Sequence, residues 1–168
     1  MTTQSDREKN WDNQLEPRIK FLREEGLYLE AFYLYAATIE HALQINISHH
    51  EDWIEHVLKR SSIQFKKYTI ERLREKTLGQ LIELFSRYHG DARLISELHA
   101  FNSFRKKIIH HILDHTIEQL DSEAKSRDIP YYRLVAKLYR LSYKLSTKFL
   151  RVYKRKLSRA RASTSRTH

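Results

Sequence analysis

The chain has 168 residues, of which 40% are hydrophobic, and it carries a formal net charge of +10 with no cysteine. Three glycines and two prolines are too few for the frequent turns of a β-sandwich or barrel, and the hydrophobic content is too high for a disordered chain. Without cysteine the chain has no disulfide scaffold, thiol nucleophile or iron–sulfur site. The length together with the low Gly and Pro content indicates a single all-α domain.

The positive charge is concentrated towards the C-terminus. Asp128 is the last acidic residue, and 12 of the 31 Lys and Arg residues follow it. A one-sided basic field of this kind attracts phosphate polymers or anionic lipid. There is no apolar signal region at the N-terminus, and no apolar run approaches the roughly 18 residues of a membrane span. We therefore expect a cytoplasmic protein.

The first predicted helix runs from about Trp11 to Glu25, after a frayed segment of residues 1–10, and ends at Gly26. Residues 27–47 are apolar on nearly every face at 100° per residue, which is typical of a helix surrounded by other helices. We expect this segment to be the central helix of the fold.

A polar break is predicted at residues 48–50, after the central helix. A charged, amphipathic stretch then covers residues 51–76, with an interruption near residues 61–62. Thr77 is a good helix N-cap, and the helix that it starts is expected to continue to Gly90.

Asp91 is predicted to cap the next helix. Asn102 and Ser103 are expected to interrupt that helix and to cap another, which runs to about Ser126.

The last predicted helix starts at Asp128, has Pro130 in its first turn and reaches about Ser158. Residues 159–168 are expected to be a disordered basic tail. The sequence thus predicts one domain over residues 11–158, an up-and-down bundle of five to six helices with a long basic C-terminal helix. At least about 60% of the residues should be helical.

Ten histidines raise the question of metal binding. His111 and His115 lie at positions i and i+4, as two ligands on one helix face would, but the third ligand and the general-base Glu of a zinc protease are absent from this stretch. We interpret them as solvated surface histidines, and we predict neither a metal nor another cofactor.

Arg105 is unusual because it projects onto an apolar stripe. At 100° per residue it falls near the centre of the stripe formed by the apolar residues of segment 103–121. A guanidinium directed into a core needs a partner. Two interpretations remain open: the side chain reaches out of the core and pairs with a Glu, or it lines a cleft that accepts an anion. His110 and His111 project to opposite flanks of the same stripe.

Three segments carry a resemblance to a known family. These are LGQLIEL (78–84), an Ile- and Leu-containing helix (94–98) and FNSFRKKIIHHIL (101–113). Together they resemble the HEPN family, whose last core helices carry an Arg-x(4–6)-His motif, and the likeness covers roughly residues 20–125. The motif here is Arg105-x4-His110, and His111 also lies within the allowed spacing.

HEPN membership implies a four- or five-helix bundle, usually a homodimer in which two motifs face each other across a cleft. It also implies metal-independent RNA cleavage in many members, often as toxins or in antiviral defence. Active members often carry an acidic residue on the long core helix, where this chain has Glu40. The resemblance assigns phosphate binding to Arg105 and proton transfer to His110, assisted by Glu40 and His111. Such chemistry suits His and Arg, because His titrates near neutrality and Arg stays charged.

The C-terminal helix carries a basic ribbon beside an apolar stripe, with five tyrosines interleaved. Because no acidic residue interrupts it, we interpret it as an RNA-binding surface on which the tyrosines could stack against unpaired bases, and membrane binding as the lesser possibility. The ribbon consists of Arg133, Lys137, Arg140, Lys144, Lys148, Arg151 and Arg155, and the tyrosines are Tyr131, Tyr132, Tyr139, Tyr143 and Tyr153.

Two functions stay open at this point. The first is a HEPN-type endoribonuclease that acts on RNA as a homodimer, a toxin or defence effector with an antitoxin or other protein partner. The second is a non-catalytic helical module that binds nucleic acid or a protein through the basic ribbon. Lys106 favours the second, because the family commonly has a polar uncharged residue after the motif Arg.

Overall fold

The computed structural model describes residues 14–59, 62–111 and 114–164. Helices account for 83% of these residues, and none of them lies in a strand. The prediction of an all-α helical bundle is therefore confirmed. Residues 1–10, which were predicted to be frayed, lie outside the described residues.

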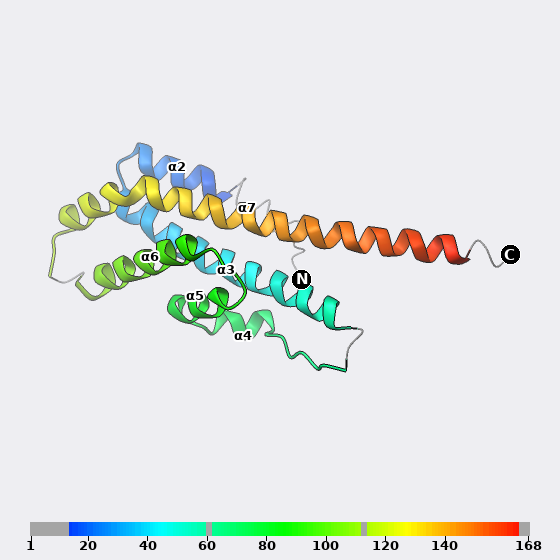
Figure 1. Ribbon diagram of the computed structural model, residues 1–168. Coiled ribbons are helices and arrows are strands. Elements are labelled where there is room, and N and C mark those ends of the chain that lie inside the picture. The colour runs from blue at the N-terminus through cyan, green and yellow to red at the C-terminus, as the bar shows by residue number, and fades with distance from the viewer. Residues whose placement is uncertain (1–13, 60–61, 112–113, 165–168) are drawn as a thin grey trace. The chain divides into compact units, whose positions relative to one another are not determined.

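The helices of the described residues are labelled in Figure 1: α2 (Glu16–Glu24), α3 (Tyr28–Leu58), α4 (Ile70–Arg74), α5 (Leu78–Ser86), α6 (Ala92–His111) and α7 (Ile117–Thr164). They belong to two compact units. The first unit comprises Met1–His41 and Asp91–Val135, and the second comprises Ala42–Gly90 and Ala136–His168. Both long helices, α3 and α7, contribute residues to each unit. The single domain over residues 11–158 stays a prediction.

Three helix boundaries lie where the sequence predicts them. Gly26 has a φ of +78°, a left-handed conformation that favours glycine, and it follows the end of α2. Thr77 and Gln80 form a reciprocal capping box, because each side chain accepts a hydrogen bond from the other's backbone N–H, at 3.4 and 3.0 Å. Asp91 Oδ1 accepts a hydrogen bond from the backbone N–H of Leu94 at 3.0 Å. These local signals are confirmed.

The predicted break at residues 48–50 is wrong, because α3 continues without interruption to Leu58. The His50 ring stacks on Tyr88, with 6.0 Å between ring centroids, and also contacts Phe85. Packing of this kind outweighs the weak helix propensity of Ser and His.

The predicted break at Asn102 and Ser103 is also wrong, since α6 is continuous through both residues. Phe101 and Phe104, on either side of the two polar residues, are buried and pack against Phe32, each with 5.3 Å between ring centroids. These contacts fix α6 against α3 and hold the helical register through the polar dipeptide.

The last helix begins earlier than the sequence predicts. α7 starts at Ile117, after a capping box in which the backbone N–H of Thr116 donates to Gln119 Oε1 at 3.0 Å and the backbone N–H of Gln119 donates to Thr116 Oγ1 at 3.3 Å. The predicted start at Asp128 is wrong, and Pro130 lies inside the helix rather than in its first turn. The Asp128 side chain contacts other helices instead of capping its own.

α7 also ends later than predicted. It extends to Thr164, so the expected end near Ser158 is wrong, and residues 159–164 of the predicted disordered tail are helical. The remaining residues of that tail, 165–168, lie outside the described residues.

A buried carboxylate joins three helices of the first unit. Asp128 on α7 is 5% exposed. Its Oδ2 accepts a hydrogen bond from Arg23 Nε of α2 at 2.6 Å, and its Oδ1 accepts one from the Tyr35 hydroxyl of α3, also at 2.6 Å. Burial, and then the hydrogen bond to Asp128, raise the pKa of Tyr35, so the phenol stays a donor throughout the physiological range. Figure 1 shows α2 lying alongside this part of α7.

The second unit has its own buried carboxylate, Glu51 on α3, which is 1% exposed. Its oxygens accept a hydrogen bond from the Tyr88 hydroxyl at 2.8 Å and one from the backbone N–H of Tyr68 at 3.0 Å. Residues 62–69 form no helix, in agreement with the interruption expected near residues 61–62, and the Tyr68 bond ties this segment to α3.

We predict that Asp128→Ala destabilises the fold strongly. The substitution leaves the Tyr35 hydroxyl buried without an acceptor and Arg23 without its counter-ion. The free energy of unfolding should fall by roughly 2–4 kcal/mol. Urea denaturation followed by circular dichroism measures this change.

The matched control is Asp52→Ala, which removes an acid from an exposed pair with Lys67. Surface pairs contribute about 0–1 kcal/mol, so this variant should unfold near the parent. Equal effects of the two substitutions would contradict the central role of Asp128.

Candidate functional site

Two of the predicted site residues lie against each other in the first unit. Arg105 on α6 forms an ion pair with Glu40 on α3, with 3.3 Å between Nη2 and Oε1. The two side chains are 29% and 32% exposed, so the pair lies at the boundary between core and solvent. Both charged groups therefore keep part of their surface in contact with solvent.

The neighbours of each residue explain how the pair is positioned. Phe104 and Ile108 on α6 are buried, 4% and 0% exposed, and Ile39, which precedes Glu40, is fully buried. Phe104 packs on Phe32 of α3, with 5.3 Å between ring centroids, and the charged pair lies at the edge of this buried region. Arg105 thus lies beside the buried Phe104 and Ile108, and its side chain is 29% exposed and has the Glu partner that the first of the two interpretations expects.

The two motif histidines lie at the C-terminal end of α6. His110 is exposed and five residues beyond Arg105, which corresponds to about 7.5 Å along the helix axis and about 140° around it. Arg105 and His110 of one chain therefore project from different sides of α6. His111 is the last residue of α6, and its side chain lies outside the described residues.

The basic ribbon lies on α7, as the sequence predicts. Lys137 is half-buried, and the side chain of Arg155 lies outside the described residues. Lys137 and the ribbon residues after it belong to the second unit, whereas Arg133 belongs to the first. The exposed members are Arg133, Arg140, Lys144, Lys148 and Arg151.

The interleaved tyrosines have different environments. Tyr131 is 6% exposed and packs against Phe101, with 4.8 Å between ring centroids, so it belongs to the core and is unavailable for stacking on a base. The Tyr132 hydroxyl donates to Glu16 of α2. Tyr143, in contrast, is 66% exposed beside Lys144.

Sequence reasoning missed one aromatic residue beside the ribbon. Lys148 Nζ lies 4.7 Å from the centroid of the Trp53 ring near the end of α3. Trp53 gives no signal in the sequence, because the predicted break at residues 48–50 places it in a separate element, whereas α3 is continuous to Leu58.

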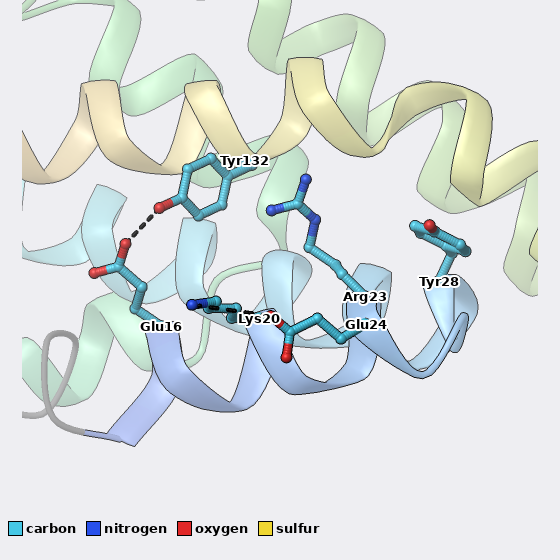
Figure 2. Close-up of a pocket in the computed structure, with 6 residues that line it drawn as sticks. All are labelled: Glu16, Lys20, Arg23, Glu24, Tyr28 and Tyr132. Carbon is cyan, nitrogen blue, oxygen red and sulfur yellow. Dashed lines mark hydrogen bonds and ion pairs between the residues drawn. The ribbon is translucent and has the colours of Figure 1, made fainter.

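The first unit also contains a pocket, shown in Figure 2, where α2 lies beside the start of α3 and beside Tyr132 of α7. Its charged groups have partners: Lys20 pairs with Glu24 at 3.8 Å, and Arg23 binds Asp128 while its guanidinium lies over the Tyr132 ring. We interpret these contacts as the attachment of α2, and none of the predicted site residues lines the pocket. It is lined by Glu16, Lys20, Arg23, Glu24, Tyr28 and Tyr132.

Among the described residues, no three or more His, Asp or Glu side chains are grouped so that they could hold a metal ion. Nor does the described part of the chain contain a helix long and apolar enough to cross a membrane.

Comparisons of the chain with protein-family models, with curated proteins and with solved structures give no match. The resemblance to the HEPN family therefore stays a prediction that rests on the residues quoted above.

We predict that the Arg105–Glu40 pair contributes little to stability. Ion pairs with this degree of solvent exposure are screened by water and typically contribute about 0–1 kcal/mol. Arg105→Ala and Glu40→Ala should each change the free energy of unfolding by no more than about 1 kcal/mol. A loss comparable to that of Asp128→Ala in the same urea titration would show that the pair is a structural support.

Proposed function

We propose that the protein is a metal-independent endoribonuclease of the HEPN type that acts as a homodimer. The observation that carries the proposal is the Arg105–Glu40 ion pair. Two residues from helices far apart in the sequence are brought within 3.3 Å and both stay accessible to solvent. They are also the Arg and the Glu that the resemblance assigns to RNA cleavage.

Arg105 would bind the phosphate that is cleaved. A guanidinium has five N–H donors in a planar fork, and the contact with Glu40 engages Nη2, so other donors remain for phosphate oxygens. The cation would stabilise the negative charge that develops on these oxygens in the transition state. Glu40 acts as a positioning residue, because its carboxylate restricts the rotamers of the long Arg side chain.

His110 would transfer a proton in the same reaction. The 2′-hydroxyl loses its proton and attacks the adjacent phosphorus, and the bond to the 5′-oxygen breaks as that oxygen takes up a proton. The products are a 2′,3′-cyclic phosphate and a 5′-hydroxyl, and no water or oxidant is consumed. His can serve as base or acid near neutral pH, and the exposed position of His110 leaves it open to substrate.

A second copy of the chain would complete the site. Arg105 and His110 of one chain project about 140° apart around α6, so one chain does not converge them on a single phosphate. Ile109 lies between them in sequence and is 43% exposed, which offers an apolar contact for another copy. We therefore propose that Arg105 of one protomer and His110 of its partner act on the same phosphate. A role as a toxin or defence effector, with an antitoxin, belongs to the same proposal.

A second candidate function is a non-catalytic module that binds nucleic acid. The exposed cations of α7 favour it, because this helix carries no acidic residue after Asp128 to neutralise them. In the endoribonuclease proposal the same ribbon holds the RNA strand.

We predict that Arg105→Ala and His110→Ala each reduce RNA cleavage in EDTA by roughly 100-fold or more, the scale of a lost acid–base group or charge-stabilising donor. Glu40→Gln should cause a smaller loss, because the Arg remains. Gel analysis of labelled RNA measures the rate, and the new 3′ ends should be 2′,3′-cyclic phosphates.

α6 supplies matched controls for these variants. Arg93 pairs with Glu97 at 3.1 Å within the same helix, so Arg93→Ala and Glu97→Gln remove an Arg–Glu pair that lies outside the site. His99→Ala removes an exposed His, and all three variants should cleave like the parent.

If His111→Ala is more damaging than His110→Ala, the assigned His is wrong although the mechanism stands. If the parent binds RNA without cleaving it, the non-catalytic module is the better account.

Mixing the two inactive variants tests the shared site. A heterodimer of Arg105→Ala and His110→Ala contains one intact pair only if Arg and His come from different protomers. Partial recovery of cleavage supports the shared site, whereas no recovery in a mixture shown to exchange subunits contradicts it.

We predict that RNA binding depends steeply on salt and that the ribbon causes this dependence. Each phosphate contact with single-stranded RNA contributes about −0.7 to the slope of log K against log salt. Arg140→Gln combined with Lys144→Gln should therefore make the slope shallower by up to about 1.4. The control is Arg72→Gln with Arg74→Gln, two exposed cations on α4. A parent slope near zero would contradict nucleic-acid binding.

A further inference from the structure

An aromatic cluster lies against the basic ribbon in the second unit. Trp53 near the end of α3 is partly exposed, and the His56 ring lies 6.1 Å from it between centroids at an interplanar angle of 30°. Lys148 of the ribbon places its Nζ 4.7 Å from the centroid of the Trp53 ring. We call Trp53, His56 and Lys148 the Trp53 platform. It joins two aromatic rings from α3 to a cation from α7.

Two acidic residues close to Trp53 in the sequence, Asp52 and Glu55, form ion pairs with Lys67. Lys67 Nζ contacts Asp52 Oδ1 at 2.9 Å and Glu55 Oε2 at 3.1 Å. This contact offsets part of the negative charge beside the platform. The ribbon residues of α7 on either side of Lys148, Lys144 and Arg151, are exposed and add positive charge.

We propose that the Trp53 platform is a stacking site for an unpaired base of single-stranded RNA, whose flanking phosphates bind the basic ribbon. This inference rests on the proposed function for its ligand, and it adds a binding residue outside the Arg105 site. The Lys148 side chain, with its flexible stem, can leave the ring for a phosphate while the base takes its place on the Trp53 face.

Three properties of the platform and of the ribbon beside it suit a nucleotide. The Trp ring offers a large π surface, on which any base can stack. Lys148 supplies the positive charge that the adjacent phosphate requires. Successive cations at Arg140, Lys144 and Lys148 are four residues apart, so they recur about every 6 Å along one helix and can follow a phosphate chain.

The same combination of Trp and Lys also occurs at membrane surfaces, but α7 is poorly suited to that role. A helix that lies on a membrane must present its apolar face to the lipid. Over residues 134–138 the apolar face of α7 is occupied within the protein, since Leu134 and Leu138 are 3% and 0% exposed. Beyond this segment the exposed residues of α7 include Tyr143 and Leu150, at 66% and 51%, but the exposed cations Arg140, Lys144, Lys148 and Arg151 outnumber them, so the observations favour RNA.

Intrinsic fluorescence tests the stacking directly, because the chain has two Trp residues, Trp11 and Trp53. In the full-length Trp11→Phe variant, Trp53 is the sole Trp. The probe is a short 2′-O-methyl oligouridine, which lacks the 2′-hydroxyl and so stays intact. We expect it to quench Trp53 emission, and an abasic strand with the same number of phosphates to quench it much less. Equal quenching by both strands would overturn base stacking.

Affinity measurements give the second test. Trp53→Ala should weaken binding of the oligouridine roughly tenfold or more, the scale of one lost base–aromatic stack. Trp53→Phe keeps an aromatic face and should restore most of the affinity. Tyr33→Ala removes a more exposed aromatic residue from the α3 segment of the first unit and should bind like the parent. Circular dichroism confirms that each variant is folded.

The outcomes separate this inference from the proposed function. If Trp53→Ala raises KM for RNA and leaves kcat unchanged, both stand. If Trp53→Ala binds like the parent while cleavage still requires Arg105, the platform is overturned and the enzyme remains. If binding depends on Trp53 but the parent never cleaves, the platform stands and the enzyme is overturned. If vesicles containing phosphatidylglycerol change Trp53 emission and RNA does not, the platform is a lipid-binding surface and the inference is overturned.

Discussion

The arrangement of the first unit depends on the burial of one carboxylate, Asp128. A buried charge is unfavourable unless it is paired and hydrogen-bonded. Here Arg23 and Tyr35 satisfy it at 2.6 Å each, so α2, α3 and α7 must meet at this point. Three residues further along α7, Tyr131 packs on the Phe101 ring of α6. The carboxylate thereby fixes the position of α7 against which α6, the helix that carries Arg105, packs.

The sequence predicts the helix boundaries that depend on local chemistry and fails at those that depend on distant contacts. Thr77 and Asp91 cap helices through hydrogen bonds to residues three positions later, so their role is visible in a short segment. Asn102 has equally polar chemistry, but it lies between two Phe residues that pack on Phe32. Nothing near Asn102 in the sequence identifies that partner, and tertiary packing decides the outcome.

The same distinction applies to the candidate site. Helical projection shows that Arg105 needs a partner, because a guanidinium on an apolar stripe is unfavourable alone. Projection cannot show that the partner is Glu40, since the pairing depends on how α6 packs against α3. The sequence does not identify Trp53 for a related reason: its proximity to Lys148 depends on the packing of α3 against α7, and the pattern predicts that the helix ends before Trp53.

The distribution of charge partners suggests how binding and chemistry are divided within the chain. Several cations before Asp128 have acidic partners within the protein, among them Arg23, Lys67 and Lys107. The exposed ribbon cations Arg133, Arg140, Lys144, Lys148 and Arg151 lie on a stretch of α7 that contains no acidic residue, which suits them to an external polyanion. Most of the ribbon belongs to the second unit, whereas Arg105 and Glu40 belong to the first. Because the two sets share no residue, the proposed enzyme separates the residues that hold the strand from those that act on the phosphate. Its binding and cleavage should therefore respond to different substitutions.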